Sequence, residues 1–310
     1  MDAKKNVVVS GAGGFIGSYL CRELYTQGYK VYGIYYSEKE IINDDNIQPI
    51  VVDLLNEKEV ESKLQGIEIE YFFHLAHNGV NGKVKSDYSV QLQNTLMTCN
   101  LVNLLCKLGC KRFIYAGSVD EFQAFNKPDA AYSKPDNSRI YAMAKYAAEQ
   151  IGKDVAYRNN MEFVELLNPM VFGPGNKTNI LPNVIMSHAL RNMPVKLITG
   201  SNKFDMIYIK DCVNAFIAIA TKGKNMESYY SGHHTIHTFK DFVIDLCNTL
   251  KLNVDLRFGE YPDVDPSFDY DLINLTKLTD DTGFECNKDL GKQFTETFEW
   301  IKNTGFETSI

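Results

Sequence analysis

A short apolar run followed by spaced glycines constrains the fold of this chain more than any other feature. The run Val7–Ser10 reads as a strand, and a helical pattern begins at Ile16. Gly11 permits a tight turn, Gly14 lets the backbone approach a ligand closely, and Gly17 lets the helix pack against the strand. Because the helix N-terminus also presents free N–H groups and the positive end of its dipole, the pattern predicts a phosphate-binding turn.

Short β-rich runs alternate with longer helical patterns through the first half of the chain. The predicted strands span residues 7–10, 30–35, 50–53, 71–75, 113–116 and 163–166, and the predicted helices span 16–27, 85–108 and 142–158. Several strands are almost continuously apolar, which is typical of strands buried on both faces in a parallel sheet covered by helices. The alternation predicts an α/β fold, a Rossmann-like doubly wound parallel sheet.

The pattern loosens after Asn168, where a turn-rich stretch precedes helical segments at 181–191, 211–220 and 239–250. Thr238 followed by Asp241 predicts a capped start for the last of these. We expect a dinucleotide-binding domain of residues 1–168 plus about 205–230, and a smaller mixed substrate-binding lobe of about 169–204 and 231–310. Ligands of such sheets bind at the carboxyl ends of the strands, so the crevice between the two parts is the expected site.

Composition and charge narrow the class of protein. Of the 310 residues, 45% are hydrophobic and 23% are charged, which is ordinary for a folded globular chain. The net charge of -7 argues against a nucleic-acid binder, because phosphate contacts need clustered Lys and Arg. Seven dispersed cysteines without a CxxC pair suit a reducing compartment. With no signal-peptide pattern and no apolar run long enough to cross a membrane, we expect a cytoplasmic protein without membrane contact.

The end of the second predicted strand bears on the choice between NAD and NADP. The glycine turn in this strand–helix context predicts dinucleotide binding, and an acid at that strand end would bind the adenosine ribose and indicate NAD. Tyr35 and Tyr36 occupy the position, with neither an acid nor an arginine there. The sequence therefore indicates NAD(P) without separating the two forms, and the missing acid favours NADP(H).

A tyrosine and a lysine one helical turn apart suggest acid–base chemistry. Tyr141 and Lys145 share a helix face, and Ser118 ends the preceding predicted strand. Tyrosine has a pKa of ~10, so bringing it near neutrality requires about 4 kcal/mol. A cation ~4 Å away contributes about that much at an effective dielectric of about 20. We expect Tyr141 to be the general acid, Lys145 and an oxidised nicotinamide to lower its pKa, and Ser118 to hydrogen-bond the reacting oxygen.

Further motifs follow one another along nearly the whole chain. They are Gly11–Gly17, Asp53-Leu54, His74–Ala76, Asn94, Ser118, Tyr141 with Lys145 and Glu149, Gly173–Gly175, and Asp211. In this order they resemble the extended branch of the short-chain dehydrogenase/reductase superfamily, the nucleotide-sugar epimerases, dehydratases and reductases. The resemblance implies cofactor contacts by Gly11, Gly14, Phe15, Ile16, Gly17, Tyr36, Asp53, Leu54, Leu75, Ala76, His77, Asn94 and Lys145. It implies a structural role for His74.

The same resemblance implies a nucleoside-diphosphate sugar as substrate, with hydride transfer at a ring carbon, usually C4. The candidate substrate-binding residues are Asp120, Asn179, Leu181, Arg191, Lys203 and Tyr208, which would otherwise be ordinary surface or packing residues. Three positions depart from the family pattern, where Leu167, Met170 and Phe204 replace an arginine, an asparagine and a diphosphate-gripping arginine. Lys203 could supply a point charge instead, without the bidentate fork of arginine.

The segment after Ser118 bears on the reaction. Related 4,6-dehydratases carry an acid pair directly after the hydroxyl residue, whereas this chain has Val119 before Asp120. By resemblance, we expect a reductase of a 4-keto (deoxy)sugar nucleotide, in the chemistry of polysaccharide biosynthesis. A C4 epimerase with tightly bound NAD is the first alternative, and a non-catalytic NAD(P)-binding regulator on the same fold is the second.

A histidine string, His233, His234 and His237, precedes the helix that Thr238 is predicted to cap. It cannot place two histidines one turn apart on that helix, and no glutamate completes a zinc-protease signature. We expect no metal site there.

Two predicted helices, the one that contains Tyr141 and the one near 94–108, are candidates for a paired-helix interface in a homodimer, as in the related enzymes. The second helix carries apolar residues at Leu96, Leu101, Leu104 and Leu105. These positions fit core packing equally well, so the sequence leaves both uses open.

Overall fold

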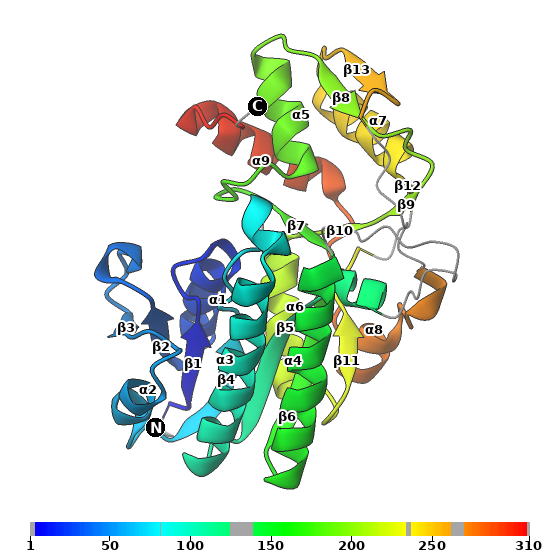
Figure 1. Ribbon diagram of the computed structural model, residues 1–310. Helices are drawn as coiled ribbons and strands as arrows, with labels where there is room; N and C mark the ends of the chain where they lie inside the picture. Colours follow the sequence, from blue (N-terminus) through cyan, green and yellow to red (C-terminus); the bar gives the residue numbers. More distant parts are fainter. Residues whose placement is uncertain (1–3, 81, 125–138, 234–236, 262–269, 309–310) are drawn as a thin grey trace. The chain divides into compact units, whose positions relative to one another are not determined.

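The first strand and the first helix meet through the glycine turn, as the sequence predicts. In the computed structural model, β1 (Asn6–Ser10) buries its valines and α1 (Phe15–Thr26) follows the turn. The structure describes residues 4–80, 82–124, 139–233, 237–261 and 270–308 (Figure 1).

Seven strands form one parallel sheet, with the strand order β11-β6-β5-β4-β1-β2-β3. Besides β1, its strands are β2 (Lys30–Tyr35), β3 (Ile47–Val51), β4 (Ile69–His74), β5 (Arg112–Ser118), β6 (Glu162–Asn168) and β11 (Ser228–Tyr230). This confirms the predicted doubly wound α/β fold. The chain order reverses at β1, which lies between β4 and β2, and such a switch point is where ligands of these sheets bind.

Helices flank this sheet. They are α1, α2 (Glu57–Leu64), α3 (Tyr88–Lys107), α4 (Arg139–Arg158), α6 (Ile209–Lys222) and α8 (Lys277–Thr282), with 3₁₀ turns η1 (Glu38–Glu40), η2 (Gly82–Ser86) and η3 (Val119–Ala124). Helices α3 and α4 lie side by side (Figure 1). The predicted start of α3 at residue 85 is wrong because Asp87 caps the helix, where its Oδ1 accepts from Ser89 N at 2.9 Å.

The chain divides into two compact units. The first consists of Met1–Leu167, Val213–Tyr230 and Thr276–Phe284, and the second of Asn168–Cys212, Ser231–Leu275 and Glu285–Ile310. The predicted boundaries differ at Asn168 and at two longer segments, 205–212 and 276–284. The first of these contains a strand that pairs within the second unit, and the second contains α8, whose Thr282 carbonyl accepts from Lys222 Nζ at 3.0 Å in the first unit.

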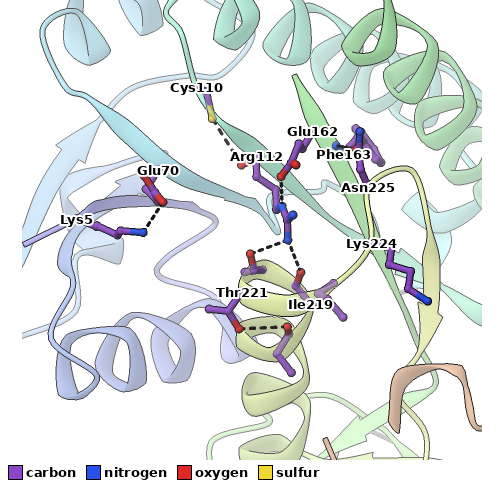
Figure 2. Close-up of polar contacts among 12 residues, drawn as sticks. Lys5, Glu70, Cys110, Arg112, Glu162, Phe163, Ile219, Thr221, Lys224 and Asn225 are labelled. Carbon is purple, nitrogen blue, oxygen red and sulfur yellow. Dashed lines mark hydrogen bonds and ion pairs between the residues drawn. The ribbon is translucent and has the colours of Figure 1, made fainter. Parts of the chain in front are cut away.

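Arg112 ties the end of α6 to the sheet (Figure 2). Its Nε donates to Glu162 Oε2 across 2.6 Å, and its Nη1 donates to the carbonyls of Ile219 and Ala220 at 3.1 and 2.9 Å. These carbonyls belong to the last turn of the helix, where acceptors lack intrahelical partners and the dipole favours a cation. A side chain of β5 thus anchors a helix that comes about 100 residues later in the chain.

Short strand pairs and an aromatic core build the second unit. The parallel pairs are β7 (Met170–Phe172) with β10 (Met206–Tyr208) and β8 (Val195–Leu197) with β13 (Leu256–Phe258), and the antiparallel pair is β9 (Lys203–Phe204) with β12 (His237–Thr238). Its helices are α5 (Leu181–Leu190), α7 (Phe239–Leu250) and α9 (Leu290–Thr304), and η4 spans Tyr270–Leu272. The Phe172 ring lies 5.4 Å from that of Tyr208 and 5.5 Å from that of Phe294. As predicted, Thr238 caps α7, and its Oγ1 accepts from Asp241 N at 3.1 Å.

Across the described ranges, the helices are all too short or too polar to cross a membrane.

Candidate functional site

The turn between β1 and α1 requires glycine at several points. Gly11 has a φ of 70°, which other residues rarely adopt. A Cβ at Gly17 would lie 2.1 Å from the Gly11 oxygen, so a side chain there would force the helix off the turn. Gly14 begins α1 without a side-chain cap, so the first N–H groups of the helix, at Phe15 and Ile16, can serve an anion.

A cavity of about 280 Å³ opens beside this turn. Its lining includes the predicted cofactor residues Gly11, Gly14, Tyr36, Asp53, Leu54, Leu75, Ala76 and His77, together with Ile34, Glu40, Val52, Leu55, Asn78 and Met97. Most of these residues lie at or after the carboxyl ends of β1, β2, β3 and β4, which is the switch point of the sheet, and Met97 comes from α3. Gly11 and Gly14 leave the backbone of this turn open to a ligand, and together with the N-terminus of α1 they fit the pyrophosphate of a dinucleotide.

His74 holds the ends of β1 and β4 together, in agreement with the structural role expected for it. Leu75 N and Ala76 N donate to Ser10 Oγ at 3.2 and 3.3 Å, so the Ser10 hydroxyl donates to His74 Nδ1, 2.8 Å away. His74 Nε2 then donates to Thr98 Oγ1 at 3.0 Å. Burial lowers the pKa of His74 to about 3, so the imidazole is neutral and both of its nitrogens are used.

Asn94 shapes the loop after β4 and does not itself line the cavity. Its Oδ1 accepts from Asn78 N at 3.0 Å, and its Nδ2 donates to Asn78 O at 2.8 Å. His77, which precedes Asn78 in the cavity wall, is held in the same way: its Nε2 lies 2.9 Å from Gln91 Oε1. Burial lowers the pKa of His77, so its neutral ring donates to Gln91 from that nitrogen. Two side chains of α3 therefore position the wall of the cavity.

Ser118, Tyr141 and Lys145 come together at the end of β5 and the start of α4. The Tyr141 side chain is hydrogen-bonded to that of Ser118. Lys145 donates from Nζ to Ala116 O at 2.7 Å and lies 4.7 Å from the centre of the Tyr115 ring. Both Tyr141 and Lys145 are buried. Their catalytic roles stay a prediction: Tyr141 and Ser118 are in contact, and Lys145 lies one helical turn beyond Tyr141 on α4.

Burial dominates the acidity of Tyr141. Desolvation raises the pKa of the phenol, Asp120 and Glu121 raise it further, and the hydrogen bond with Ser118 lowers it. The Lys145 ammonium donates to a backbone carbonyl and the tyrosine is buried, so lowering of this pKa by Lys145 together with an oxidised nicotinamide stays a prediction for the cofactor-bound protein. At neutral pH the phenol therefore carries its proton.

Lys85, a cation that faces Tyr141, was not predicted from the sequence. Its Nζ lies 4.8 Å from the centre of the Tyr141 ring and 2.7 Å from Asp120 Oδ2. Asp120, a predicted substrate residue, is thus paired beside the tyrosine. Tyr141 also contacts His77: the two rings meet edge-on, with their centres 5.2 Å apart. Lys85 lies in η2, which the sequence pattern assigned to the following helix, so it gave no sign of this position.

Two buried glutamates behind Ser118 were also missed. Glu121 Oε1 accepts from Ser118 N at 2.8 Å, and Glu165 lies so near Gly117 that a Cβ there would be 2.3 Å from its Oε1. The two carboxyl groups are hydrogen-bonded to each other, so one must carry a proton. Burial raises the pKa of both, and it lowers the pKa of Lys145 to about 8. The signal in the sequence was a glutamate inside an otherwise apolar strand.

The predicted substrate residues are spread over the molecule. Asp120 belongs to the first unit, and the other five belong to the second. Asn179 is exposed before α5 and Leu181 begins that helix, whereas Arg191 caps its far end, about 15 Å away at the helical rise per residue. Tyr208 is buried on β10. One small group cannot contact both ends of α5 together.

Two of these residues are cations with exposed partners. Arg191 Nη1 lies 3.1 Å from Glu307 Oε2, and Lys203 Nζ lies 3.5 Å from Asp271 Oδ1. The Glu307 and Asp271 side chains are 68% and 83% exposed, so these pairs are weak and an incoming anion can replace the carboxylate.

Within the described part of the chain, no group of three or more His, Cys, Asp or Glu side chains could hold a metal ion. Of the histidine string, His234 lies outside the described residues. His233 N donates to Met206 O at 3.1 Å, and His237 lies on β12, ahead of the helix that Thr238 caps.

Comparisons with known proteins agree with this geometry. The model of the NAD dependent epimerase/dehydratase family matches residues 7–232. CDP-abequose synthase of Salmonella typhimurium (strain LT2) is 29% identical over 264 residues, which cover 80% of this chain and 81% of that protein.

Solved structures share the fold. UDP-N-acetylglucosamine 4-epimerase from Methanobrevibacter ruminantium M1, in complex with UDP-N-acetylmuramic acid, superposes with a TM-score of 0.81 at 23% identity and covers 97% of this chain and 99% of its own. The Bordetella bronchiseptica enzyme WbmF, in complex with NADH, gives 0.79 at 21% identity and covers 97% and 93%. The resemblance drawn from the order of motifs is confirmed, and the chain belongs to the NAD-dependent epimerase/dehydratase family.

Proposed function

We propose that this chain is an NAD(P)-dependent oxidoreductase that reduces a 4-keto (deoxy)sugar carried on a nucleoside diphosphate. The observation that carries the proposal is the buried Tyr141 phenol, hydrogen-bonded to Ser118 and one helical turn from Lys145. The names of the relatives support the substrate class, because one makes a CDP-linked sugar and another is solved with a UDP-linked one.

Reduction of a carbonyl needs a proton donor at the oxygen while hydride reaches the carbon. Bound NAD(P)H supplies the hydride from its nicotinamide. Tyr141 is the proposed donor because its phenol is hydrogen-bonded to Ser118 and carries its proton at neutral pH. Bound cofactor and Lys145 would lower its pKa toward the range in which proton transfer is efficient. Ser118 donates a hydrogen bond to the same oxygen and fixes its position. Lys145, when protonated, stabilises the phenolate that remains after the O–H proton has moved to the substrate.

The cavity of the first unit is the proposed dinucleotide site. The first N–H groups of α1 hold the pyrophosphate, Asp53 and Leu54 lie beside the adenine, and Leu75, Ala76 and His77 follow the rest of the cofactor. The absence of an acid at positions 35 and 36 favours NADP(H), but Glu40 also lines this cavity and bears on that choice.

The second unit is the proposed holder of the nucleotide part of the substrate. Arg191 and Lys203 are candidates for the diphosphate, because each is paired with an exposed carboxylate that a phosphate can replace. Phe204 leaves no arginine beside Lys203, so that contact would be a single ammonium rather than a bidentate clamp.

We also propose a homodimer formed through α3 and α4. Leu96 on α3 is 58% exposed and Met143 on α4 is 55% exposed, although both are large apolar side chains. The other leucines considered for this interface belong to the core: Leu101, Leu104 and Leu105. The exposed pair lies on neighbouring helices, so a second copy could cover it.

The first test is mass spectrometry of the dinucleotide that copurifies, followed by assays of keto and hydroxy nucleotide sugars with NADH and NADPH. We expect one equivalent of reduced cofactor to be consumed per 4-hydroxy product. Tyr141→Phe should lower turnover by at least about 100-fold and retain cofactor binding. Tyr157→Phe, on the same helix but 71% exposed, is the matched control and should keep both.

The same assays separate the alternatives. An epimerase would interconvert two sugars without net change in cofactor absorbance and would retain NAD through purification. A regulator would leave the absorbance unchanged with every nucleotide sugar, and Tyr141→Phe would alter only its binding to a partner. Either result would replace the reductase proposal.

A further inference from the structure

The wall of the cavity at the end of β2 carries an acid that the strand itself lacks. The strand ends at Tyr35, which is buried, and Tyr36 follows as an exposed residue. Glu40, in the turn η1, lines the cavity together with Tyr36. Its neighbours in that turn, Glu38 and Lys39, are not among the lining residues.

Two contacts bring Glu40 back to the strand end. Tyr36 N donates to Glu40 Oε2 at 3.3 Å, so the carboxylate lies against the first residue after β2. The backbone of Glu40 also packs on the glycine turn, where a Cβ at Gly13 would lie only 2.6 Å from the Glu40 oxygen. The missing side chain at Gly13 therefore allows η1 to fold over the turn.

The rest of the lining leaves Glu40 as the charge that faces the strand end. No Lys or Arg is among the residues that line this cavity in the described structure. The other acid of the lining, Asp53, follows β3, one strand further out, and its Oδ1 accepts from Leu55 N at 3.0 Å.

In a sheet of this kind the pyrophosphate binds at the N-terminus of α1, and the adenosine ribose then reaches the end of β2. A carboxylate there accepts hydrogen bonds from ribose hydroxyls. The same carboxylate repels a 2′-phosphate, and with no cation in the lining nothing offsets that repulsion.

We propose that Glu40 selects the cofactor, favouring the free ribose of NAD(H) over the 2′-phosphorylated ribose of NADP(H). The inference deepens the proposed function and rests on it for the class of cofactor. It reverses the preference drawn from Tyr35 and Tyr36, because the acid reaches the strand end from four residues beyond Tyr36.

Fluorescence titration of NADH and NADPH against three proteins tests this: the unaltered chain, Glu40→Gln and Glu38→Gln. Glutamine at position 40 keeps an acceptor oxygen for Tyr36 N and removes the charge. Glu38→Gln removes the same charge from the same turn, outside the cavity. Circular dichroism spectra establish that all three proteins are folded.

We expect the unaltered chain to bind NADH at least about tenfold more tightly than NADPH, and Glu40→Gln to remove most of that ratio. Glu38→Gln should leave it unchanged. The ratio should also shrink as salt is raised, because the repulsion is screened.

Three outcomes would overturn the proposal: tighter binding of NADPH by the unaltered chain, an unchanged ratio in Glu40→Gln, or an equal change in Glu38→Gln. Failure of the reductase assignment is a separate result. If no keto sugar is reduced but Glu40→Gln still changes the ratio of the NADH and NADPH affinities, the reductase assignment is refuted and the role of Glu40 is supported. If neither dinucleotide binds, the reductase assignment and the role of Glu40 are both refuted.

Discussion

Replacing Glu165 with glutamine tests the charge state of the buried cluster behind Ser118. Glu165 is 2% exposed and hydrogen-bonded to Glu121, and burial raises its pKa from an ordinary 4.5 to about 7. At about 1.4 kcal/mol per pH unit between folded and unfolded pKa values, that difference corresponds to about 3 kcal/mol of stability.

The sign follows from which state holds the proton. Between pH 4.5 and about 7 the unfolded chain has released the Glu165 proton and the native protein retains it, so the free energy of unfolding falls as pH rises. Glutamine does not titrate, and its amide oxygen can still accept the hydrogen bond that Glu121 donates. Relative to the unaltered protein, Glu165→Gln should therefore gain about 3 kcal/mol between pH 4.5 and pH 8.

Urea unfolding followed by far-UV circular dichroism at closely spaced pH values measures this difference directly. Glu165→Leu is the companion variant, because it also removes the titration but leaves the Glu121 carboxyl without its acceptor. It should show the same pH trend from a lower starting stability. A difference between Glu165→Gln and the unaltered protein that stays constant across this range would refute the reasoning, since the native Glu165 would then be ionised throughout it.

Tyr141→Phe should lower turnover by about 100- to 10,000-fold and leave the affinity for NADH unchanged, which steady-state kinetics and fluorescence titration measure separately. Gly17→Ala should weaken NADH binding and lower stability by about 1–3 kcal/mol in urea, because the new methyl meets the Gly11 oxygen; full binding would contradict the packing at the turn. Leu96→Asp should convert a particle near twice 35.2 kDa to a monomer by light scattering, and a monomeric unaltered chain would exclude the proposed dimer.

Features encoded within one stretch of chain were predictable. The glycine turn, the strand that precedes it and the helix that follows each leave a local signature, and all three form as expected. The cap of α7 is equally local, because Thr238 and Asp241 lie three residues apart and contact each other directly. The parallel sheet follows from the alternation of such elements, since a parallel pair needs a helical crossover.

Features that depend on tertiary contacts between different elements were not predictable from the sequence. Glu40 is four residues from the strand end in sequence, and only the fold of η1 over Gly13 brings its carboxylate back. The hydrogen bond between Glu121 and Glu165 depends on β5 and β6 lying side by side in the sheet. Hydrophobic periodicity in the sequence predicts neither contact, because it reports on one helix or strand at a time.

The ionisation of Tyr141 depends on contacts of this kind between distant parts of the chain. The sequence placed a cation near the phenol, and at ~4 Å that cation would offset most of the cost of ionisation. In the structure the Lys145 ammonium donates to Ala116 O, and Glu121 and Glu165 stand behind it with their shared proton. The local field therefore leaves the phenol protonated, as a proton donor to a carbonyl must be. Oxidation of an alcohol would require the opposite charge state, so the positive charge for that direction has to arrive with the bound ligand.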